Sequence, residues 1–269
     1  MSDSRVYTEL AKLAGPVRQK ILSMTHSAKS SHIGSCFSVV DVLTCVYSYA
    51  DKDPENKIIL SKGHAAAAMY AVLAEFRKLK ENLNAVYGVD GEKFSGHVSH
   101  FVHKDICLST GSLGHGLPYG VGISLAKKKA ENKGKVFVIM SDGEMDEGTT
   151  WESALFANHF RLNNLIVFID RNRLQSLSNT ESTIRLEPLK KKWKSFGWQT
   201  YEVNAHSYKD LMMLIGKVIA NQKKPVCIIA NSIKGYGISF MENSVKWHYK
   251  SPNDDELDLG NAELKEKFE

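Results

Sequence analysis

Polar residues follow two apolar runs of the sequence, at points where a buried strand would end. Asp142 and Gly143 follow the run at 135–140, and Asn172 follows the run at 164–170. One helix and a return strand fit between them, so Asp142 and Asn172 would lie at neighbouring strand ends. Their oxygen atoms suit a hard divalent cation that also takes phosphate oxygens, and Gly143 lets the backbone approach a phosphate closely. The pattern predicts a metal–diphosphate site, although Asp-Gly after a strand is also a common turn.

Histidines form the second group of candidate functional residues. The chain has 10 histidines, and several stand in predicted loops beside Gly, Ser or Trp: His32, His64, His97, His115 and His248. An imidazole with a pKa of about 6.5 can move protons among hydroxyl groups. His64 also opens a predicted helix at 65–79, and a helix N-terminus with a donor side chain favours a diphosphate. A single loop histidine is more often a surface residue, so the interpretation depends on their repeated placement at strand ends and helix starts.

A glycine-rich run at 110–116 leads into a predicted helix near Leu117. Such a run could cradle a cofactor ring or a phosphate, or it could be a tight turn. It contains no GxGxxG pattern, which argues against a dinucleotide-dependent dehydrogenase.

Alternating strand-like and helix-like segments must position these residues. Continuous β-branched runs are typical of buried strands, and the predicted strands span 57–61, 135–140, 164–170, 225–230 and, more weakly, 199–203. Helix-like stretches span 6–28, 65–79, 116–132, 149–162 and 207–222. This alternation predicts an α/β fold with a doubly wound, mostly parallel sheet and helices on both faces. Residues 1–252 would form the binding domain, and the acidic stretch 253–269 would be a surface tail or a docking helix.

Composition limits the class of protein. The chain has 269 residues and a net charge of +5, and its basic residues form no dense stripe. It is therefore compatible with anionic small molecules rather than with nucleic acid. No membrane span is expected, because no run approaches about 18 apolar residues. The four cysteines form no CxxC pair, and the N-terminus has no apolar signal region, so we expect reduced thiols and a cytoplasmic location.

Seven motifs in order resemble the N-terminal half of transketolase, most closely the form that is split into two chains. The resemblance runs from about Arg18 to Pro252. The segment from Asp142 to Asn172 resembles the thiamine-diphosphate signature of this superfamily, with SDG where GDG is usual. The motifs are SSHIGS, SKGHAAA, SGH, TGSLGHG, SDGEMDEG, DRNRLQ and KGYGISFMENSVKWHYKSP.

The resemblance implies a role for each matching residue. Mg²⁺ would be held by the side chains of Asp142 and Asn172 and the backbone carbonyl of Leu174. The diphosphate would contact Gly143 and His64, and Asn172 and His248 would also contact the cofactor. The aminopyrimidine and thiazole rings would be lined by Gly111, Ser112 and Leu113. The reacting carbon and the sugar hydroxyls would face His32, His97 and His248. Glu147 matches a family position at the contact between subunits.

The resemblance also implies an activity and a partner. The expected activity is transfer of a two-carbon ketol unit from a ketose phosphate donor to an aldose phosphate acceptor, with thiamine diphosphate and Mg²⁺ as cofactors. The domain that supplies the activating glutamate would belong to a separate C-terminal subunit, giving an α2β2 assembly. Two alternatives stay open. One is another thiamine-diphosphate enzyme, similar to deoxyxylulose-phosphate synthase or a 2-oxo-acid dehydrogenase α-subunit, and the other is a non-catalytic homologue.

Overall fold

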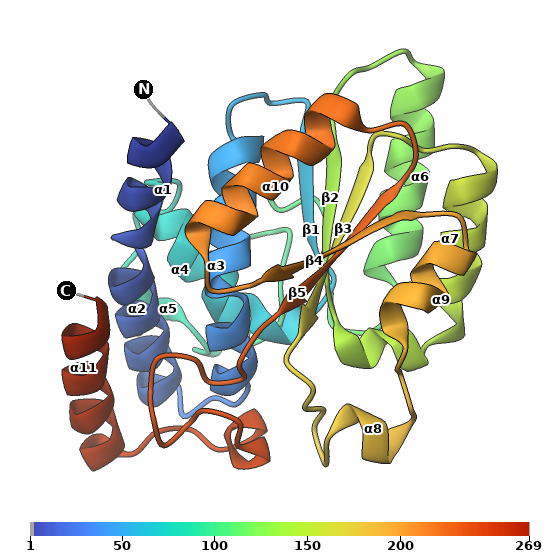
Figure 1. The fold of residues 1–269 in the computed structure, drawn as a ribbon. Coiled ribbons are helices and arrows are strands. Elements are labelled where there is room, and N and C mark those ends of the chain that lie inside the picture. Colours follow the sequence, from blue (N-terminus) through green and yellow to red (C-terminus); the bar gives the residue numbers. More distant parts are fainter. Residues whose placement is uncertain (1–2, 269) are drawn as a thin grey trace.

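The chain folds around a parallel β-sheet that is covered by helices on both faces (Figure 1). The computed structural model describes residues 3–268. Within that range five strands pair in the order β1-β2-β3-β5-β4. They are β1 (Lys57–Leu60), β2 (Val136–Ser141), β3 (Leu165–Arg171), β4 (Gln199–Asn204) and β5 (Val226–Asn231). All five predicted strands are therefore confirmed to within a residue at each end.

Both faces of the sheet are buried at β1, β2, β3 and β5, which explains why these four strands are continuous apolar runs, whereas the edge strand β4 is partly exposed. Successive side chains of a strand point to opposite faces. Phe137 and Ile139 of β2 belong to one hydrophobic core, and Val138 and Met140 belong to a second core on the other face. The predicted doubly wound α/β class is confirmed.

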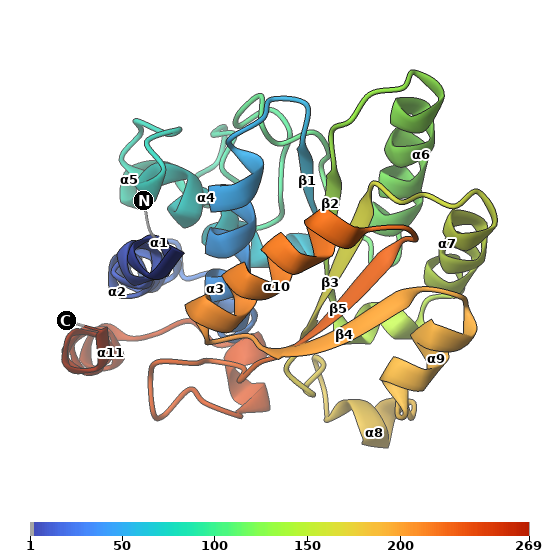
Figure 2. The same cartoon turned by 45° about the horizontal axis from the view of Figure 1, so that its top comes forward.

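The helices divide between these two cores (Figure 2). One face is covered mainly by α2 (Ala14–Ser27), α3 (Ile33–Ala50), α4 (Ala66–Glu75) and α10 (Tyr208–Asn221), and the other by α6 (Gly116–Lys129), α7 (Gly148–His159) and α9 (Leu189–Ser195). Short elements at the loops are η1 (Gly63–Ala65), α5 (Leu83–Val86), η2 (Asp142–Asp146), α8 (Thr180–Thr183) and η3 (Val245–His248). Helices α1 (Asp3–Ala11) and α11 (Asp254–Phe268) lie near the two chain ends.

Helix α3 is absent from the elements predicted from the sequence. Nearly all of its residues are buried, so it has no polar face to reveal a helical period, and its valines favour strands over helices. Within residues 3–268, α3 is also the one helix that is long and apolar enough by composition to cross a membrane. The expectation that no such run exists is therefore wrong. Because 89% of this stretch is buried inside the protein, α3 is a core helix.

The acidic C-terminal stretch forms a helix that docks on the protein. Leu264 of α11 is fully buried, and the ring of Phe268 lies 4.9 Å from the Arg18 guanidinium of α2. The sequence predicted either a surface tail or a docking helix for this stretch, and the structure contains the helix. The division of the chain at residue 252 stays a prediction.

Candidate active site

The two candidate metal-binding side chains lie at adjacent tips of the sheet. Strands β2 and β3 pair in register, with Ser141 opposite Asp170, so Asp142 and Asn172 each follow the end of a neighbouring strand. Both are buried, with exposed fractions of 2% and 5%. The backbone N–H of Arg173 donates to Asp142 Oδ2 at 2.6 Å and ties the two tips together. The adjacency predicted from the sequence is confirmed, while the metal-binding role stays a prediction.

The amide of Asn172 has a defined orientation. Its Nδ2 faces Asp170 Oδ2 and Ser38 Oγ at 3.4 Å each. Its Oδ1 is therefore turned the other way, where it accepts a hydrogen bond from the Leu174 backbone N–H at 3.0 Å. The Asp170 carboxylate thus holds the amide nitrogen of Asn172 and leaves the amide oxygen facing away from it. An oxygen atom is the ligand that a hard cation requires.

Two carboxylates at the strand tips have different electrostatic surroundings. Asp170 is fully buried and pairs with the fully buried ammonium of Lys62. Burial alone would raise the pKa of Asp170, but the charge and hydrogen bond of Lys62, with the hydroxyls of Ser232 and Ser38, hold it below its usual value. Burial and the nearby Asp170 carboxylate instead raise the pKa of Asp142 to about 7. Asp142 is therefore the carboxylate that a bound cation would stabilise.

The donor set at the strand tips fits a hard divalent cation. It offers the Asp142 carboxylate, the Asn172 amide oxygen and the Leu174 carbonyl. That carbonyl accepts a hydrogen bond from Lys234 Nζ at 3.1 Å, which leaves one of its two lone pairs for another partner. Among residues 3–268, no three His, Cys, Asp or Glu side chains are grouped so that they could hold a metal ion. A cation here would accordingly need phosphate or water oxygens as its remaining ligands.

Four histidines from separate parts of the chain gather beside these tips. The His32 ring centroid lies 5.4 Å from that of His64, 5.7 Å from that of His97 and 5.0 Å from that of His248. His32 precedes α3 with a φ of 74°, and its backbone N–H donates to the His248 carbonyl at 2.8 Å. All four of these histidines, selected from the sequence, therefore share one site.

Three of these histidines are neutral near pH 7. Burial, with the charges of neighbouring histidines, Lys234 and Lys62, lowers the pKa of His32 to about 4. The same influences lower the pKa of His248 to about 3 and that of His64 well below its ordinary value. Lys234 Nζ lies 2.9 Å from His248 Nδ1. Because an ammonium group has no lone pair, Nδ1 accepts and the proton of His248 resides on Nε2, where it can be donated to a hydroxyl.

These pKa values predict how stability depends on pH. The unfolded chain binds protons at its histidines near pH 6.5, whereas folded His32 stays neutral down to about pH 4. Between these values the unfolded state holds more protons, so the contribution of His32 is complete above pH 6.5 and is lost as the pH falls to about 4. Asp142, with its raised pKa, opposes this trend between pH 7 and 4, so wild type must be compared with a variant that lacks only the histidine.

The suitable variant is His32→Asn, because asparagine tolerates the left-handed backbone of this position. We expect the free energy of unfolding of wild type, relative to His32→Asn, to decrease steadily from pH 6.5 to 4. Urea unfolding at several pH values measures it. A difference that does not change with pH would contradict the neutral state of His32.

The glycine-rich loop packs against the turn that bears His64. Thr110 Oγ1 donates to the Leu60 carbonyl at 2.6 Å, and the Gly114 N–H donates to Glu144 Oε1 at 3.1 Å. Between these anchors Ser112 is exposed, and Gly111 and Leu113 are half-buried. These three residues therefore remain accessible to a ligand that approaches the histidines.

Gly143 and Gly63 differ in why glycine is present. A Cβ on Gly63 would lie 2.3 Å from the Thr110 carbonyl oxygen, so packing within the protein excludes any side chain there. A Cβ on Gly143 would lie 3.5 Å from the Gln175 side chain, which is an ordinary contact. Packing within the protein therefore does not require glycine at position 143. A ligand that approaches the backbone closely would require it, because a side chain would stand in its way.

This contrast makes a paired prediction. Gly63→Ala should destabilise the fold by about 1–3 kcal/mol or more through overpacking. Gly143→Ala should change stability by less than about 0.5 kcal/mol and lower the affinity for thiamine diphosphate by about tenfold, the equivalent of one hydrogen bond. Thermal unfolding and calorimetric titration measure the two effects. Unchanged affinity in Gly143→Ala would remove the backbone of Gly143 from the diphosphate site.

Glu147 follows the turn η2, which begins at Asp142. Glu147 is exposed at the start of α7. A Cβ on Gly114 would lie only 2.6 Å from the Cβ of Glu147, so the two residues are close neighbours. Its exposure leaves it accessible to a second chain, and its role at a contact between subunits stays a prediction.

Several charged residues of the site were not identified from the sequence. All lie inside the quoted motifs or at the end of a predicted strand: Lys62, Glu144, Asp170 and Lys234. Glu144 accepts hydrogen bonds from Ser61, Gly114 and Ser141, which joins three loops. The available signal was their place in the sequence, since Glu144 directly follows Gly143, and Lys62 and Asp170 lie two residues before His64 and Asn172.

The fold and a matching sequence profile define a class of protein, the thiamine-diphosphate-binding α/β domains. The sequence profile of the family described as "Transketolase, thiamine diphosphate binding domain" matches residues 11–268. The chain therefore belongs to the transketolase family and comprises its thiamine-diphosphate-binding domain.

Three relatives of similar length are named as subunits. The chain is 37% identical over 270 residues to an apulose-4-phosphate transketolase subunit of Actinobacillus succinogenes, covering 97% of this chain and 98% of the relative. It is 32% identical to a 6-deoxy-6-sulfo-D-fructose transketolase subunit of Clostridium sp., covering 99% of each. A transketolase structure from Pichia stipitis shares the fold, with a TM-score of 0.86 and 22% identity over 95% of this chain. This chain spans 40% of that longer protein.

Proposed function

We propose that the chain is the cofactor-binding subunit of a two-chain transketolase. It would act with a C-terminal partner to transfer a two-carbon ketol unit from a ketose phosphate to an aldose phosphate. The observation that carries the proposal is the gathering of His32, His64, His97 and His248 beside the tips that bear Asp142 and Asn172. Similarity to chains named as transketolase subunits supports it.

The residues of this site fit the cofactor pair of thiamine diphosphate and Mg²⁺. Asp142, Asn172 and the Leu174 carbonyl would hold Mg²⁺, and Gly143 and His64 would contact the diphosphate. When bound, thiamine diphosphate supplies the electron sink that cleavage of a carbon–carbon bond requires. The buried ammonium groups of Lys62 and Lys234 provide a positive potential that favours an anion at the same place.

The histidines would handle the sugar. Both substrates carry several hydroxyl groups, so the site needs several donors and acceptors that can share protons. Neutral His248 can donate from Nε2, because its Nδ1 accepts from Lys234. Neutral His32 can take part through Nε2, because Ser31 Oγ lies 2.9 Å from its Nδ1. His97 is exposed, so a substrate can reach it.

The partner would complete the active site. Two relatives that match nearly end to end are named as subunits, which supports a second chain with the pyrimidine-binding domain. We propose an α2β2 assembly in which each active site lies at an interface, and exposed Glu147 contributes to the contact between subunits.

Reconstitution tests this function. The isolated chain, the isolated C-terminal partner and their mixture should be assayed for ketol transfer with several ketose phosphates, including apulose 4-phosphate. We expect activity in the mixture only. Full activity of the isolated chain would reject the partner dependence. If calorimetry detects no binding of thiamine diphosphate with Mg²⁺ to either the chain or the mixture, the cofactor role is wrong.

A further inference from the structure

A buried hydrogen-bond network lies behind the candidate active site and joins α2, α3 and the loop before α10. Arg18 and Asp41 are 0% and 1% exposed. Arg18 Nη1 and Nη2 donate to the two Asp41 carboxylate oxygens at 2.9 and 2.8 Å. Tyr208 Oη donates to Asp41 Oδ1 at 2.8 Å, and His206 Nδ1 lies 2.8 Å from Asp41 Oδ2.

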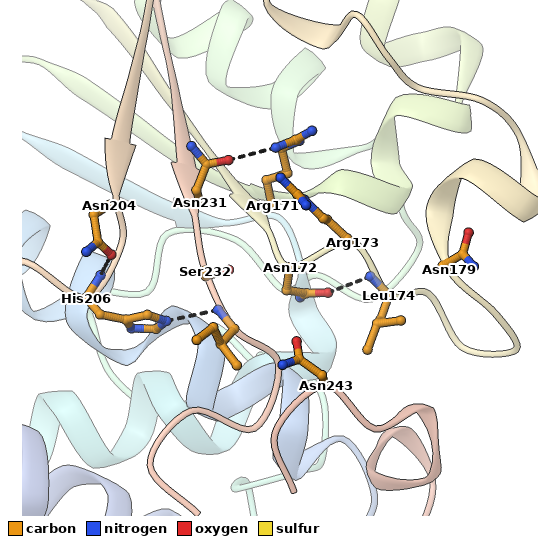
Figure 3. A pocket seen from close by; sticks show the side chains of 11 residues that line it. Arg171, Asn172, Arg173, Leu174, Asn179, Asn204, His206, Asn231, Ser232 and Asn243 are labelled. Atoms are coloured by element: carbon orange, nitrogen blue, oxygen red, sulfur yellow. Dashed lines mark hydrogen bonds between the residues drawn. The ribbon is translucent and has the colours of Figure 1, made fainter. Parts of the chain in front are cut away.

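The network determines which nitrogen of His206 carries the proton. Burial would raise the pKa of Asp41, but Arg18 and His206 hold it well below its usual value, so Asp41 is a carboxylate. A carboxylate only accepts hydrogen bonds, so His206 Nδ1 must donate. His206 Nε2 in turn lies 2.9 Å from the backbone nitrogen of Ile233 and accepts its N–H (Figure 3). Only the neutral ring with its proton on Nδ1 satisfies both contacts.

Ile233 begins the segment that carries two residues of the candidate site. The next residue is Lys234, whose Nζ contacts the Leu174 carbonyl and His248 Nδ1. We call residues 233–248 the post-β5 loop, because it follows β5 and ends at His248. The position of its backbone near residue 233 therefore determines where the Lys234 ammonium lies.

The network contacts the post-β5 loop at two further points. The His206 ring stacks on Tyr236, with centroids 3.6 Å apart and planes at 12°. Arg18 Nε donates to the Tyr236 carbonyl at 3.0 Å. One polar cluster thus fixes the start of the loop through an amide, a ring and a carbonyl.

We propose that His206 is a positioning residue, which holds the post-β5 loop so that Lys234 and His248 face the strand-tip site. The proposal deepens the function proposed above and rests on it for the catalytic consequence. The positioning itself is a property of the protein alone and can be tested without any activity.

Two substitutions separate the two hydrogen bonds of the His206 ring. A glutamine amide reaches the position of Nε2, so His206→Gln can keep the acceptor for the Ile233 N–H. An asparagine amide reaches only the position of Nδ1, so His206→Asn keeps the donor to Asp41 and loses that acceptor. Both remove the ring that stacks on Tyr236, which makes them a matched pair.

The first measurement is amide hydrogen exchange of the full chain. We expect exchange at the Ile233 amide to accelerate about tenfold in His206→Asn, as for the loss of one hydrogen bond, and to stay within about threefold of wild type in His206→Gln. Exchange in the sheet serves as the control for global stability. Equal exchange in the two variants would overturn the proposal.

The second measurement uses the chain reconstituted with its C-terminal partner. We expect kcat to fall about ten- to hundredfold in His206→Asn and to be restored to within about threefold of wild type by His206→Gln, with KM less affected. Loss of kcat in both variants to the same extent would overturn the positioning role. Absence of activity in the wild-type complex would instead reject the proposed function and leave the exchange result to decide the positioning.

A third measurement needs no variant. Nitrogen NMR of wild type should show His206 protonated at Nδ1, with a coupling between Nε2 and the Ile233 amide nitrogen across the hydrogen bond. A proton on Nε2 would overturn the proposal even if neither variant folds.

Discussion

Asp142→Ala is expected to abolish Mg²⁺-dependent retention of thiamine diphosphate. Asp142 is the carboxylate of the proposed donor set, and a hard divalent cation depends on anionic oxygen ligands. Without it the set would consist of an amide oxygen and a backbone carbonyl, both neutral. Calorimetric titration with the cofactor at several Mg²⁺ concentrations measures the effect. Retention that equals wild type would remove Asp142 from the metal site.

Asp142 also affects the stability of the metal-free protein, where its charge is expected to be unfavourable. Burial and the nearby Asp170 raise the pKa of Asp142 to about 7, which means that the charged form is unfavourable in the metal-free protein. Asp142→Asn keeps the shape of the side chain and removes the charge. Without Mg²⁺ at pH 8, we expect Asp142→Asn to unfold no earlier than wild type, although it too fails to retain the cofactor. A large loss of stability would instead assign Asp142 a structural role through its bonds to Gly143 and Arg173.

Lys62→Met is expected to cause the largest loss of stability. Lys62 and Asp170 are both fully buried and paired, and Lys62 Nζ also donates to the Ser35 carbonyl at 3.0 Å. Removal of one partner leaves an uncompensated charge in the core, which typically costs about 3–5 kcal/mol. Urea unfolding measures the free energy. Near-wild-type stability would show that Asp170 is compensated by other groups.

Two controls accompany this substitution. Lys12 pairs with Glu9 on the surface, where the side chains are 65% and 57% exposed, so Lys12→Met should change stability by less than about 0.5 kcal/mol. Asp170→Asn in the Lys62→Met background removes the charge that was left unpaired. The double variant should therefore be more stable than Lys62→Met by itself, and a further decrease would contradict the charge argument.

The strand tips could be predicted because their signal is local in sequence. Four buried strands appear as apolar runs, and the carboxyl ends of neighbouring parallel strands must meet at one edge. That reasoning placed Asp142 beside Asn172, as the register of β2 and β3 confirms. Helix α3 could not be predicted because it gives no such local signal. It is buried on nearly all sides, so its sequence has no alternation of polar and apolar residues.

Pairings across long sequence separations could not be predicted. Lys62 and Asp170 lie in different motifs, and neither residue indicates its partner. Asp41 and His206 are farther apart still in the sequence. Asp41 lies in α3, which was not predicted, and His206 lies in a loop outside the seven motifs. Their hydrogen bond depends on how α3 packs against the loop before α10.

The sequence by itself determined the strand-and-helix order, the residue types at the sheet tips and the resemblance to a thiamine-diphosphate-binding family. Only the tertiary structure decided the charge states, the tautomers and the orientation of each side chain. The physical reason is that periodicity and motifs depend on neighbours along the chain. A pKa or a tautomer depends on burial and on charges that folding brings within a few ångströms.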